Sequence, residues 1–267
     1  AFYGCTSLTS ITLPDSVTSI EYGTFNQCMY LTSVVIGNGV TGIGDWAFAS
    51  CSSLTSVTMG NGVTNIGNHA FDGCYSMWSI TIPDGVTSIG EKAFYGCGGL
   101  ISITVPDSVT TLGSGAFQIC TNLTNVVMGK SVVNIGSYAF DSCYRLKSVY
   151  FKGDAPIPDV NVFRGCSALS TIYYVEGTEG WTNPWQGIAT ATWTPEPEPT
   201  VPELAFAIED GKLILRWAVS SNAMLEVSPQ ASGGLWTHAG VAEIKDGTWY
   251  YEVPLSSGAG YYRLVAE

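Results

Sequence analysis

Basic side chains are scarce in this sequence. Its 267 residues include 10 Lys and Arg against 22 Asp and Glu, which gives a formal net charge of −12 at pH 7. Proteins that bind nucleic acids need basic residues to neutralise phosphates, so this composition argues against a nucleic-acid partner. Charged residues make up only 12% of the chain, about half of the roughly 25% usual in soluble domains. Ser, Thr, Asn and Gly must therefore cover much of the surface.

Long apolar runs and an initiator methionine are missing, and histidines are few. No uninterrupted apolar stretch approaches the ~18 residues of a membrane span, so we expect no membrane insertion. The sequence begins at Ala1 without a basic and apolar leader, and we expect any export signal to be absent or already removed. His69 and His238 are the only histidines, which leaves few groups suited to proton transfer. We therefore expect no enzyme, no catalytic residues and no cofactor.

The cysteines are regularly spaced, with a step of 23 residues. They are Cys5, Cys28, Cys51, Cys74, Cys97, Cys120, Cys143 and Cys166. Each follows a Phe by three positions and precedes a Leu or Met by three, and this period extends to about Tyr174. Within one unit, Leu31 to Ile36 alternates like a short half-buried strand and Gly44 marks a turn. A unit this short cannot bury its own apolar face, so the period predicts a stack of coils, a solenoid.

A family resemblance rests on the consensus of this unit, which reads F-x-x-C-x-x-L-x-x-[IV]-x-[ILMV]-[PG]-[DN]-x-V-x-x-[IL]-G-x-x-A. It resembles the BspA-type bacterial leucine-rich repeat over roughly the first two thirds of the chain. Residues of the Val40 type stand near the Asn of commoner leucine-rich repeats, so we expect the usual Asn ladder to be missing. The resemblance implies a curved, right-handed β-rich solenoid with a parallel sheet. It also implies a secreted or cell-surface location and a role in adhesion, and it supplies no catalytic residues.

We interpret the eight cysteines as a structural ladder of free, buried thiols. Equivalent positions in adjacent parallel strands lie about 4.8 Å apart with parallel side chains. A disulfide needs Cβ atoms roughly 3.5–4.5 Å apart. Disulfides and a bound metal remain alternatives, although the ladder lacks the ligand spacing of a structural zinc site, and we predict no metal.

In each unit, the residues that alternate with the apolar ones predict an uncharged, solvent-facing ladder of Ser and Thr. It begins at Ser10 and Thr12, and towards its C-terminal end it gains Tyr150, Lys152 and Tyr173. We take these last three residues as candidate ligand contacts. The alternative is a solvated β face without a partner.

Two patterns that suggest chemistry have structural explanations. An Asp or Asn follows the strand in five units, and we expect it to close a local turn through its own backbone, with Ca²⁺ binding as the alternative. These residues are Asp15, Asn38, Asn61, Asp84 and Asp107. His69, Asp72 and Ser76 are the three residue types of a catalytic triad, but His69 occupies a variable repeat position. We expect a structural role for it.

The repeat ends in an aromatic segment that contains Trp181, Trp185 and Trp193. We expect these residues to cap the open end of the stack. The alternative is a platform of Trp181, Trp185 and Trp193 that stacks on sugar rings, and Trp181 and Trp185 join the candidate ligand contacts. We assign residues 1–193 to the solenoid and its cap.

Alternating Pro and Glu in residues 194–203 predict an extended linker. Residues 204–267 predict a small antiparallel β-sandwich, because short alternating segments are separated by Gly-containing turns. This part loosely resembles a fibronectin type III domain, with Trp217 in its core and Tyr262 in its penultimate strand. Such a sandwich would still need a final strand, so we expect an unpaired edge.

The function that these features favour is a non-catalytic, extracellular or cell-surface scaffold for adhesion or protein–protein interaction, with a protein or glycan ligand. A carbohydrate-binding accessory module is one alternative. The other is a subunit of an extracellular filament. It would assemble head to tail through the first strand, around Leu8 to Leu13, and the open edge of the sandwich.

Overall fold

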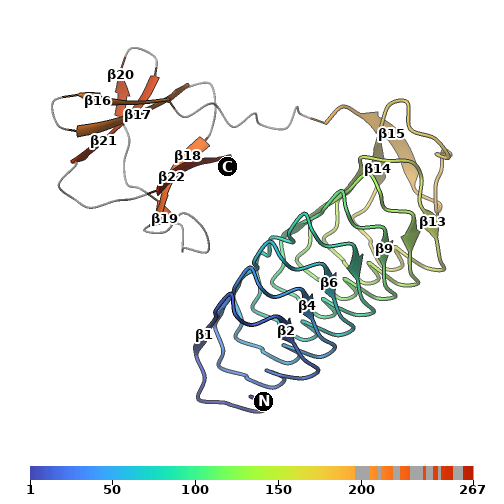
Figure 1. The fold of residues 1–267 in the computed structure, drawn as a ribbon. Coiled ribbons are helices and arrows are strands. Elements are labelled where there is room, and N and C mark those ends of the chain that lie inside the picture. Colours follow the sequence, from blue (N-terminus) through green and yellow to red (C-terminus); the bar gives the residue numbers. More distant parts are fainter. Residues whose placement is uncertain are drawn as a thin grey trace. The chain divides into compact units, whose positions relative to one another are not determined.

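The computed structural model describes residues 1–195 fully, and beyond them the backbone of seven strands and the burial of Leu215. The chain divides into two compact units, Ala1–Thr194 and Pro195–Glu267 (Figure 1). The boundaries predicted for the domains and the linker remain predictions. Residues 196–203 of that linker lie outside the described residues.

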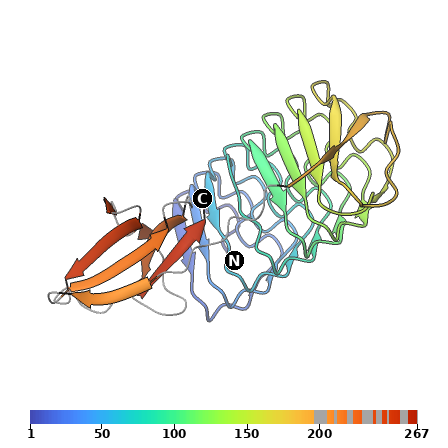
Figure 2. The same ribbon diagram turned by 90° about the horizontal axis from the view of Figure 1, so that it is seen from above.

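Parallel strands on two sides of a coil build the first unit (Figure 2). The longer strands are β1 (Ser10–Leu13), β3 (Ser33–Ile36), β5 (Ser56–Thr58), β8 (Ser102–Val105), β10 (Asn125–Met128), β12 (Ser148–Phe151), β14 (Thr171–Val175) and β15 (Ala189–Trp193). The two-residue strands are β2 (Ser19–Ile20), β4 (Gly42–Ile43), β6 (Asn65–Ile66), β7 (Ser88–Ile89), β9 (Thr111–Leu112), β11 (Asn134–Ile135) and β13 (Ile157–Pro158). The predicted parallel-sheet solenoid is confirmed.

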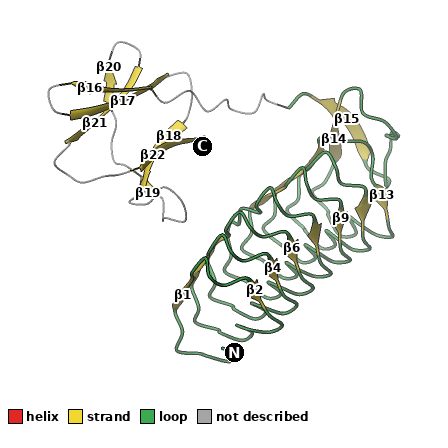
Figure 3. Ribbon diagram, viewed as in Figure 1, coloured by secondary structure: helices red, strands yellow, loops and turns green. Residues whose placement is uncertain are grey.

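Loops connect these strands throughout the first unit (Figure 3). In the part of the chain that the structure describes, no helix has the length and apolar character needed to cross a bilayer.

The register of the sheet follows the sequence period. Ser10 pairs with Ser33, and Ser33 pairs with Ser56. The last pairing is different, because Thr171 of β14 pairs with Ala189 of β15. A shorter coil therefore follows the eighth repeat unit, and its strand extends the sheet by a step that the repeat pattern does not predict.

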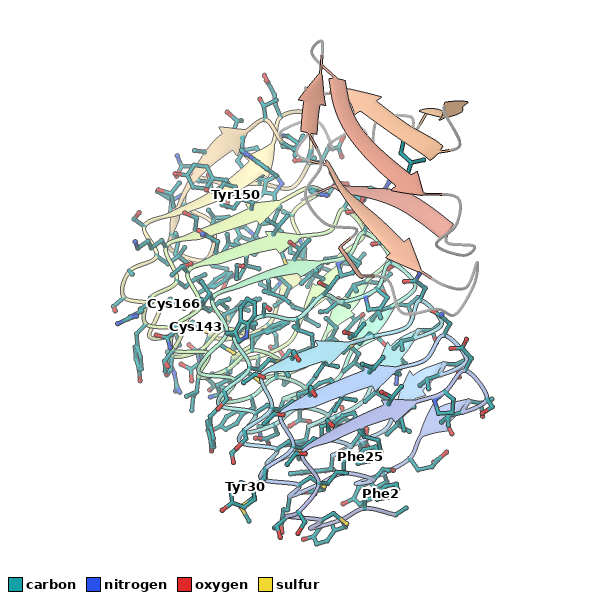
Figure 4. The ribbon with its side chains drawn as sticks, turned by 90° about the vertical axis from the view of Figure 1, so that its left-hand side faces the viewer. Phe2, Phe25, Tyr30, Cys143, Tyr150 and Cys166 are labelled. Carbon is teal, nitrogen blue, oxygen red and sulfur yellow. The ribbon has the colours of Figure 1, made fainter. Side chains whose placement is uncertain are left out.

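The core is a continuous column that runs along the stack. Stacked Phe rings form its centre, with successive ring centroids 5.1–5.6 Å apart from Phe2 to Phe163. Figure 4 shows Phe2 and Phe25 next to each other at the N-terminal end of the column. Inward Leu, Ile and Val side chains complete the core on both sides of the rings. One unit cannot form this column alone, so burial depends on stacking.

Exposed Asp and Asn side chains join neighbouring coils. Asp15 Oδ1 accepts the N–H of Asn38 at 2.7 Å, and Asn38 Oδ1 accepts the N–H of Asn61 at 3.0 Å. Asp107 Oδ1 likewise accepts the N–H of Lys130 at 3.2 Å. The expectation of local turns closed within each coil is therefore wrong at these positions. The coils are close enough for each carboxylate or amide to reach the equivalent residue of the next coil.

Every complete coil passes through left-handed backbone immediately before its cysteine. Gly73 (φ 72°) and Ile119 (φ 62°) both occupy this position. The conformation costs a residue with a Cβ atom about 1–2 kcal/mol. The fold therefore imposes strain wherever the position is not glycine.

The sheet of longer strands is interrupted in the fourth coil. Ser79–Ile82 forms no strand, so β5 and β8 belong to separate sheets. In the preceding coil, Thr55 donates both its N–H (2.9 Å) and its hydroxyl (3.0 Å) to the carbonyl of Thr32. Trp78 occupies the equivalent place, and within the described residues its N–H donates no hydrogen bond to Thr55. The repeat pattern predicts a strand here, and this pair of hydrogen bonds is lost at the point where the strand is absent.

The second unit contains two antiparallel sheets. Their strands are β16 (Ala205–Glu209), β17 (Lys212–Ala218), β18 (Ala223–Ser228), β19 (Thr237–His238), β20 (Glu243–Lys245), β21 (Thr248–Pro254) and β22 (Tyr261–Ala266). The strand orders are β16-β17-β21-β20 and β19-β18-β22. This agrees with the expected antiparallel β unit. The likeness to fibronectin type III stays a prediction, because the side chains of Trp217 and Tyr262 lie outside the described residues.

Candidate functional site

The longer strands present a face of small hydroxyl side chains to solvent. In β8 the exposed residues Ser102 and Thr104 alternate with the buried residues Ile103 and Val105. The same alternation in β5 leaves Thr58 exposed. This face carries no charged side chain on β1, β3, β5, β8 or β10, so it offers hydrogen bonds without electrostatic attraction.

Aromatic residues replace the hydroxyls at the C-terminal end of this face. Tyr150 of β12 pairs with Tyr173 of β14, and their rings stack at 4.9 Å with an interplanar angle of 14°. Trp193 of β15 lies 5.0 Å from the Tyr150 ring at an angle of 59°. All three side chains are half-buried. We call Tyr150, Tyr173 and Trp193 the aromatic cluster; in Figure 4, Tyr150 marks its place.

Trp193 reaches the cluster because β15 continues the parallel sheet. Trp193 was expected in the cap or in a sugar-stacking platform, and its place beside Tyr150 and Tyr173 was not predicted. The alternation of Ala and Thr before Trp193 was the available signal, since period-two patterns indicate a strand.

Lys152 follows β12 directly and lies at the edge of the cluster's strand. Its Nζ is 4.0 Å from Asp107 Oδ1, while Lys130 Nζ is 3.9 Å from Asp107 Oδ2. Two lysines thus share one carboxylate. Exposed ion pairs of this kind contribute only about 0–1 kcal/mol to stability.

Trp181 and Trp185 lie inside the end of the stack rather than on its face. Trp185 is 6% exposed and packs edge-on against Phe151 at 5.6 Å and Trp181 at 5.1 Å. Trp181 is half-buried and stacks on Tyr174 at 5.1 Å. This burial does not agree with a role for Trp185 as a ligand contact, because its ring surfaces are covered by the chain itself.

The eight cysteines are free, and the thiols from Cys28 to Cys166 link successive coils. Cys51 Sγ donates to the carbonyl oxygen of Phe25 in the preceding coil at 3.1 Å. The same oxygen accepts the N–H of Cys28 at 3.2 Å. A carbonyl has two acceptor sites, so the thiol fills the second one. Cys143 and Cys166 mark the other end of this ladder in Figure 4.

Burial makes these thiols unreactive. It raises the pKa of Cys51 to about 12, and it raises the pKa values of Cys74 and Cys97 well above the ordinary value. Thiolates are the nucleophilic and metal-binding form of cysteine, and the ladder holds the thiols in their protonated form at neutral pH. No cluster of metal-binding side chains occurs among the described residues.

A buried carboxylate, which the sequence analysis missed, ties the last three cysteine-containing coils together. Asp141 is 1% exposed and accepts hydrogen bonds from Gln118 Nε2 (2.8 Å) and from Arg164 Nε and a terminal guanidinium nitrogen (both 2.8 Å). The hydrogen bond from Arg164 lowers the pKa of Asp141. The three residues occupy the same place in successive repeats, which was the signal for their contact.

His69 and Asp72 also form a pair, with His69 Nδ1 2.7 Å from Asp72 Oδ2. The His69 ring stacks on Trp46 at a centroid distance of 3.9 Å. Within the described residues, Ser76 makes no hydrogen bond to His69, so these residues form no triad. The pair lies within one turn, and the stacking of His69 on Trp46 joins this turn to the preceding coil.

Comparisons with known proteins agree with this geometry. A model of the BspA type leucine-rich repeat region matches six copies over residues 1–101 and 64–179. A leucine-rich repeat protein from T. pallidum is 30% identical, with a TM-score of 0.56, over 61% of this chain and 78% of that one. A leucine-rich repeat protein from Bacteroides ovatus is 26% identical, with a TM-score of 0.42, over 65% and 57% of the two chains.

A leucine-rich cell surface protein from Faecalibacterium prausnitzii is 25% identical, with a TM-score of 0.34, over 64% of this chain and 74% of that one. No curated protein matches the chain. The repeat period, the stacked Phe and Cys residues and the family match all lead to one assignment. This chain belongs to the family of proteins with BspA type leucine-rich repeats.

Proposed function

We propose that this protein is a non-catalytic scaffold that binds a protein ligand on the strand face, at the aromatic cluster. The observation that carries the proposal is the stacking of Tyr150 and Tyr173 on a face that otherwise presents mostly small hydroxyl groups. The solenoid does not need these rings for its core, because they point away from the buried residues Val149 and Ile172.

Aromatic rings at this place favour a protein ligand. Tyr and Trp are enriched at the centres of protein interfaces, where they often contribute most of the binding energy. A carbohydrate would use the flat surfaces of the rings. Stacking at an angle of 14° leaves Tyr150 and Tyr173 covering one surface of each other, so the cluster is a poorer platform for sugars.

We further propose that the protein is secreted or displayed on a cell surface, where it serves in adhesion. The family assignment supports this location, because the resemblance to BspA-type repeats implies a secreted or cell-surface protein. The thiols are compatible with it, because oxidising compartments promote disulfides between exposed cysteines. Here the six cysteines from Cys28 to Cys143 are buried, which protects them from such pairing.

The test is a pair of arrays, one of extracellular proteins and one of glycans, probed with the labelled full chain. The variant Tyr150→Thr/Tyr173→Thr restores the side chains of the hydroxyl ladder and should leave the fold unchanged. We expect binding to proteins, and at least a tenfold loss in this variant, since interface aromatics often contribute about 2 kcal/mol or more. The control is Tyr144→Thr, which removes a 54% exposed tyrosine outside the cluster.

Other outcomes would count against the proposal. Binding confined to the glycan array would favour a carbohydrate-binding module instead. Protein binding that the cluster variant and the control variant retain equally would place the interface elsewhere. Circular dichroism of each variant separates loss of binding from loss of fold.

A further inference from the structure

Two sheets of the solenoid end at its C-terminal side, and their last strands differ. β13 is the last of the two-residue strands, and β15 is the last of the longer strands (Figure 1). The outer edge of a last strand presents backbone N–H and C=O groups that can pair with a strand of another chain. The composition of each edge therefore decides whether the fold prevents or permits such pairing.

The edge of β13 is short and blocked by proline. The N–H groups of Ile157 and Asp159 donate to carbonyls of the preceding coil at 2.7 and 2.9 Å. Successive residues of a strand direct their backbone groups to opposite sides, so Pro158 directs its nitrogen to the outer edge. Proline has no N–H to donate, and natural proteins use it to protect the edges of sheets.

The edge of β15 is longer and has no such protection. Its five residues include no proline and no charged side chain. The N–H of Thr190 donates to Asn183 Oδ1 at 3.2 Å, so Thr190 faces away from β14. By the same alternation Thr192 also faces outward. Within the described residues, neither the N–H nor the carbonyl of Thr192 has a hydrogen-bond partner, and its side chain is exposed.

This open position lies beside the aromatic cluster. Trp193 follows Thr192 directly, and its ring is 5.0 Å from the ring of Tyr150. A strand added at Thr192 would therefore continue the strand face on which the cluster lies. A polypeptide suits this place, because its backbone supplies a donor and an acceptor to the edge while one of its side chains packs against Trp193.

We propose that the edge of β15 at Thr192 accepts an extended segment of the partner protein as an added β-strand. This inference rests on the proposed function, and it specifies how the partner is held beside the aromatic cluster. The segment is uncharged and rich in β-branched residues where it pairs with β15, because β15 offers only Ala, Thr and Trp.

A second copy of this chain suits the edge less well. It would have to present the same edge, and two such edges pair over too few residues to bury the roughly 800 Å² per partner of a stable interface.

The experiment uses the full chain and a short labelled peptide in which Thr and Val alternate, with binding followed by fluorescence anisotropy. Thr192→Pro removes the outward N–H and leaves the ladder with β14 intact, since Ala191 and Trp193 face β14. We expect about tenfold weaker binding, because a backbone acceptor of the peptide loses its donor. The control Thr192→Val keeps the N–H and should bind like the wild-type protein. Thr192→Lys adds a charge to the edge without changing the backbone and should also weaken binding.

Three outcomes would overturn the inference. The first is equal peptide binding by Thr192→Pro and Thr192→Val, with circular dichroism showing that both are folded. The second is slow amide hydrogen exchange at Thr192 in the free chain, since an open edge should exchange fast and slow down only when the peptide binds. The third is a dimer in sedimentation experiments that Thr192→Pro dissociates, which would make a second copy the occupant.

The two proposals can fail separately. If Tyr150→Thr/Tyr173→Thr abolishes protein binding on the array while Thr192→Pro changes neither array nor peptide binding, the scaffold function stands and the added strand is wrong. If Thr192→Pro abolishes both kinds of binding while the cluster variant retains them, the edge stands and the aromatic cluster is wrong. If neither change matters, both proposals fall.

Discussion

The interior of the solenoid and its strand face differ in what each coil contributes. Inside, every unit supplies the same Phe and Cys, and the rings stack at nearly constant spacing from Phe2 to Phe163. On the face, Ser and Thr give way to Tyr150, Tyr173 and Trp193 at one end only. Uniformity in the core maintains the stack, whereas a local departure on the surface can create a binding site without disturbing it.

The largest effect should come from removing one ring of the column. Phe94 is fully buried and stacks on Phe71 and Phe117 at 5.3 and 5.1 Å. Phe94→Ala should lower the free energy of unfolding by about 3–5 kcal/mol, because it removes buried surface and leaves a cavity. Urea unfolding measures this loss.

The matched surface change is Tyr144→Ala, at a side chain that is 54% exposed. It should change stability by less than about 0.5 kcal/mol. Equal losses in the two variants would contradict the division between a uniform core and a permissive surface.

A smaller effect, of about 2 kcal/mol, should follow from Asp141→Asn, which replaces charge-assisted hydrogen bonds with neutral ones. The folded pKa of Asp141 is lowered, chiefly by the hydrogen bond from Arg164. Its contribution is therefore complete above the unfolded pKa of about 3.9 and is lost as the pH falls through the folded pKa.

Unfolding experiments between neutral and strongly acidic pH check this sign. The difference in stability between the wild-type protein and Asp141→Asn should shrink as the pH falls. A difference that stayed constant down to the lowest pH would mean that the charge of Asp141 does not stabilise the fold.

The repeat period allowed most of this fold to be predicted, because equivalent residues stack on one another in a solenoid. One unit around Phe25 and Cys28 therefore predicts the contacts of the others. The features that were missed depend on departures from the repeat. Trp193 joins the face through a shorter coil, and Asp141 meets Gln118 and Arg164 at a variable position of the repeat.

The candidate site was predicted only in part, for the same physical reason. Tyr150 and Tyr173 lie at a regular surface position, so the period placed them together. Trp185 lies after the last regular unit. Beyond that unit the repeat period no longer predicts which side chains point inward. Its burial depends on packing against Phe151 and Trp181.

Alanine substitutions at two glycines should change the free energy of unfolding by up to about 1 kcal/mol, with different signs. Gly73 has φ 72°, and an added Cβ there meets no atom closer than 3.7 Å, so Gly73→Ala should destabilise through backbone strain alone. At Gly42, an added Cβ meets nothing within 4 Å, and the backbone is not left-handed. Gly42→Ala should be neutral or stabilise by about 0.4–1 kcal/mol. Thermal unfolding of both variants measures the difference, and the same sign in both would contradict the assignment of strain.

An effect of similar size should come from repairing the interrupted sheet. Trp78 is 56% exposed, so Trp78→Thr sacrifices little buried surface. The new hydroxyl and the N–H can both donate to the carbonyl of Thr55, as Thr55 does to Thr32. We expect a gain of about 1 kcal/mol and slower amide hydrogen exchange over Ser79–Ile82, since exchange reports local opening of backbone hydrogen bonds.

The matched change is Ile101→Thr in the next coil. The N–H of Ile101 already donates to the carbonyl of Trp78 at 3.2 Å, so this variant adds only a hydroxyl and should gain less. Unchanged exchange over Ser79–Ile82 in Trp78→Thr would show that the interruption does not arise from the missing threonine. In that case the cause would have to lie in the packing beneath the segment, where Val57, Met59 and Ile80 are 8–9% exposed, whereas Val126 and Met128 beneath the continuous sheet are fully buried.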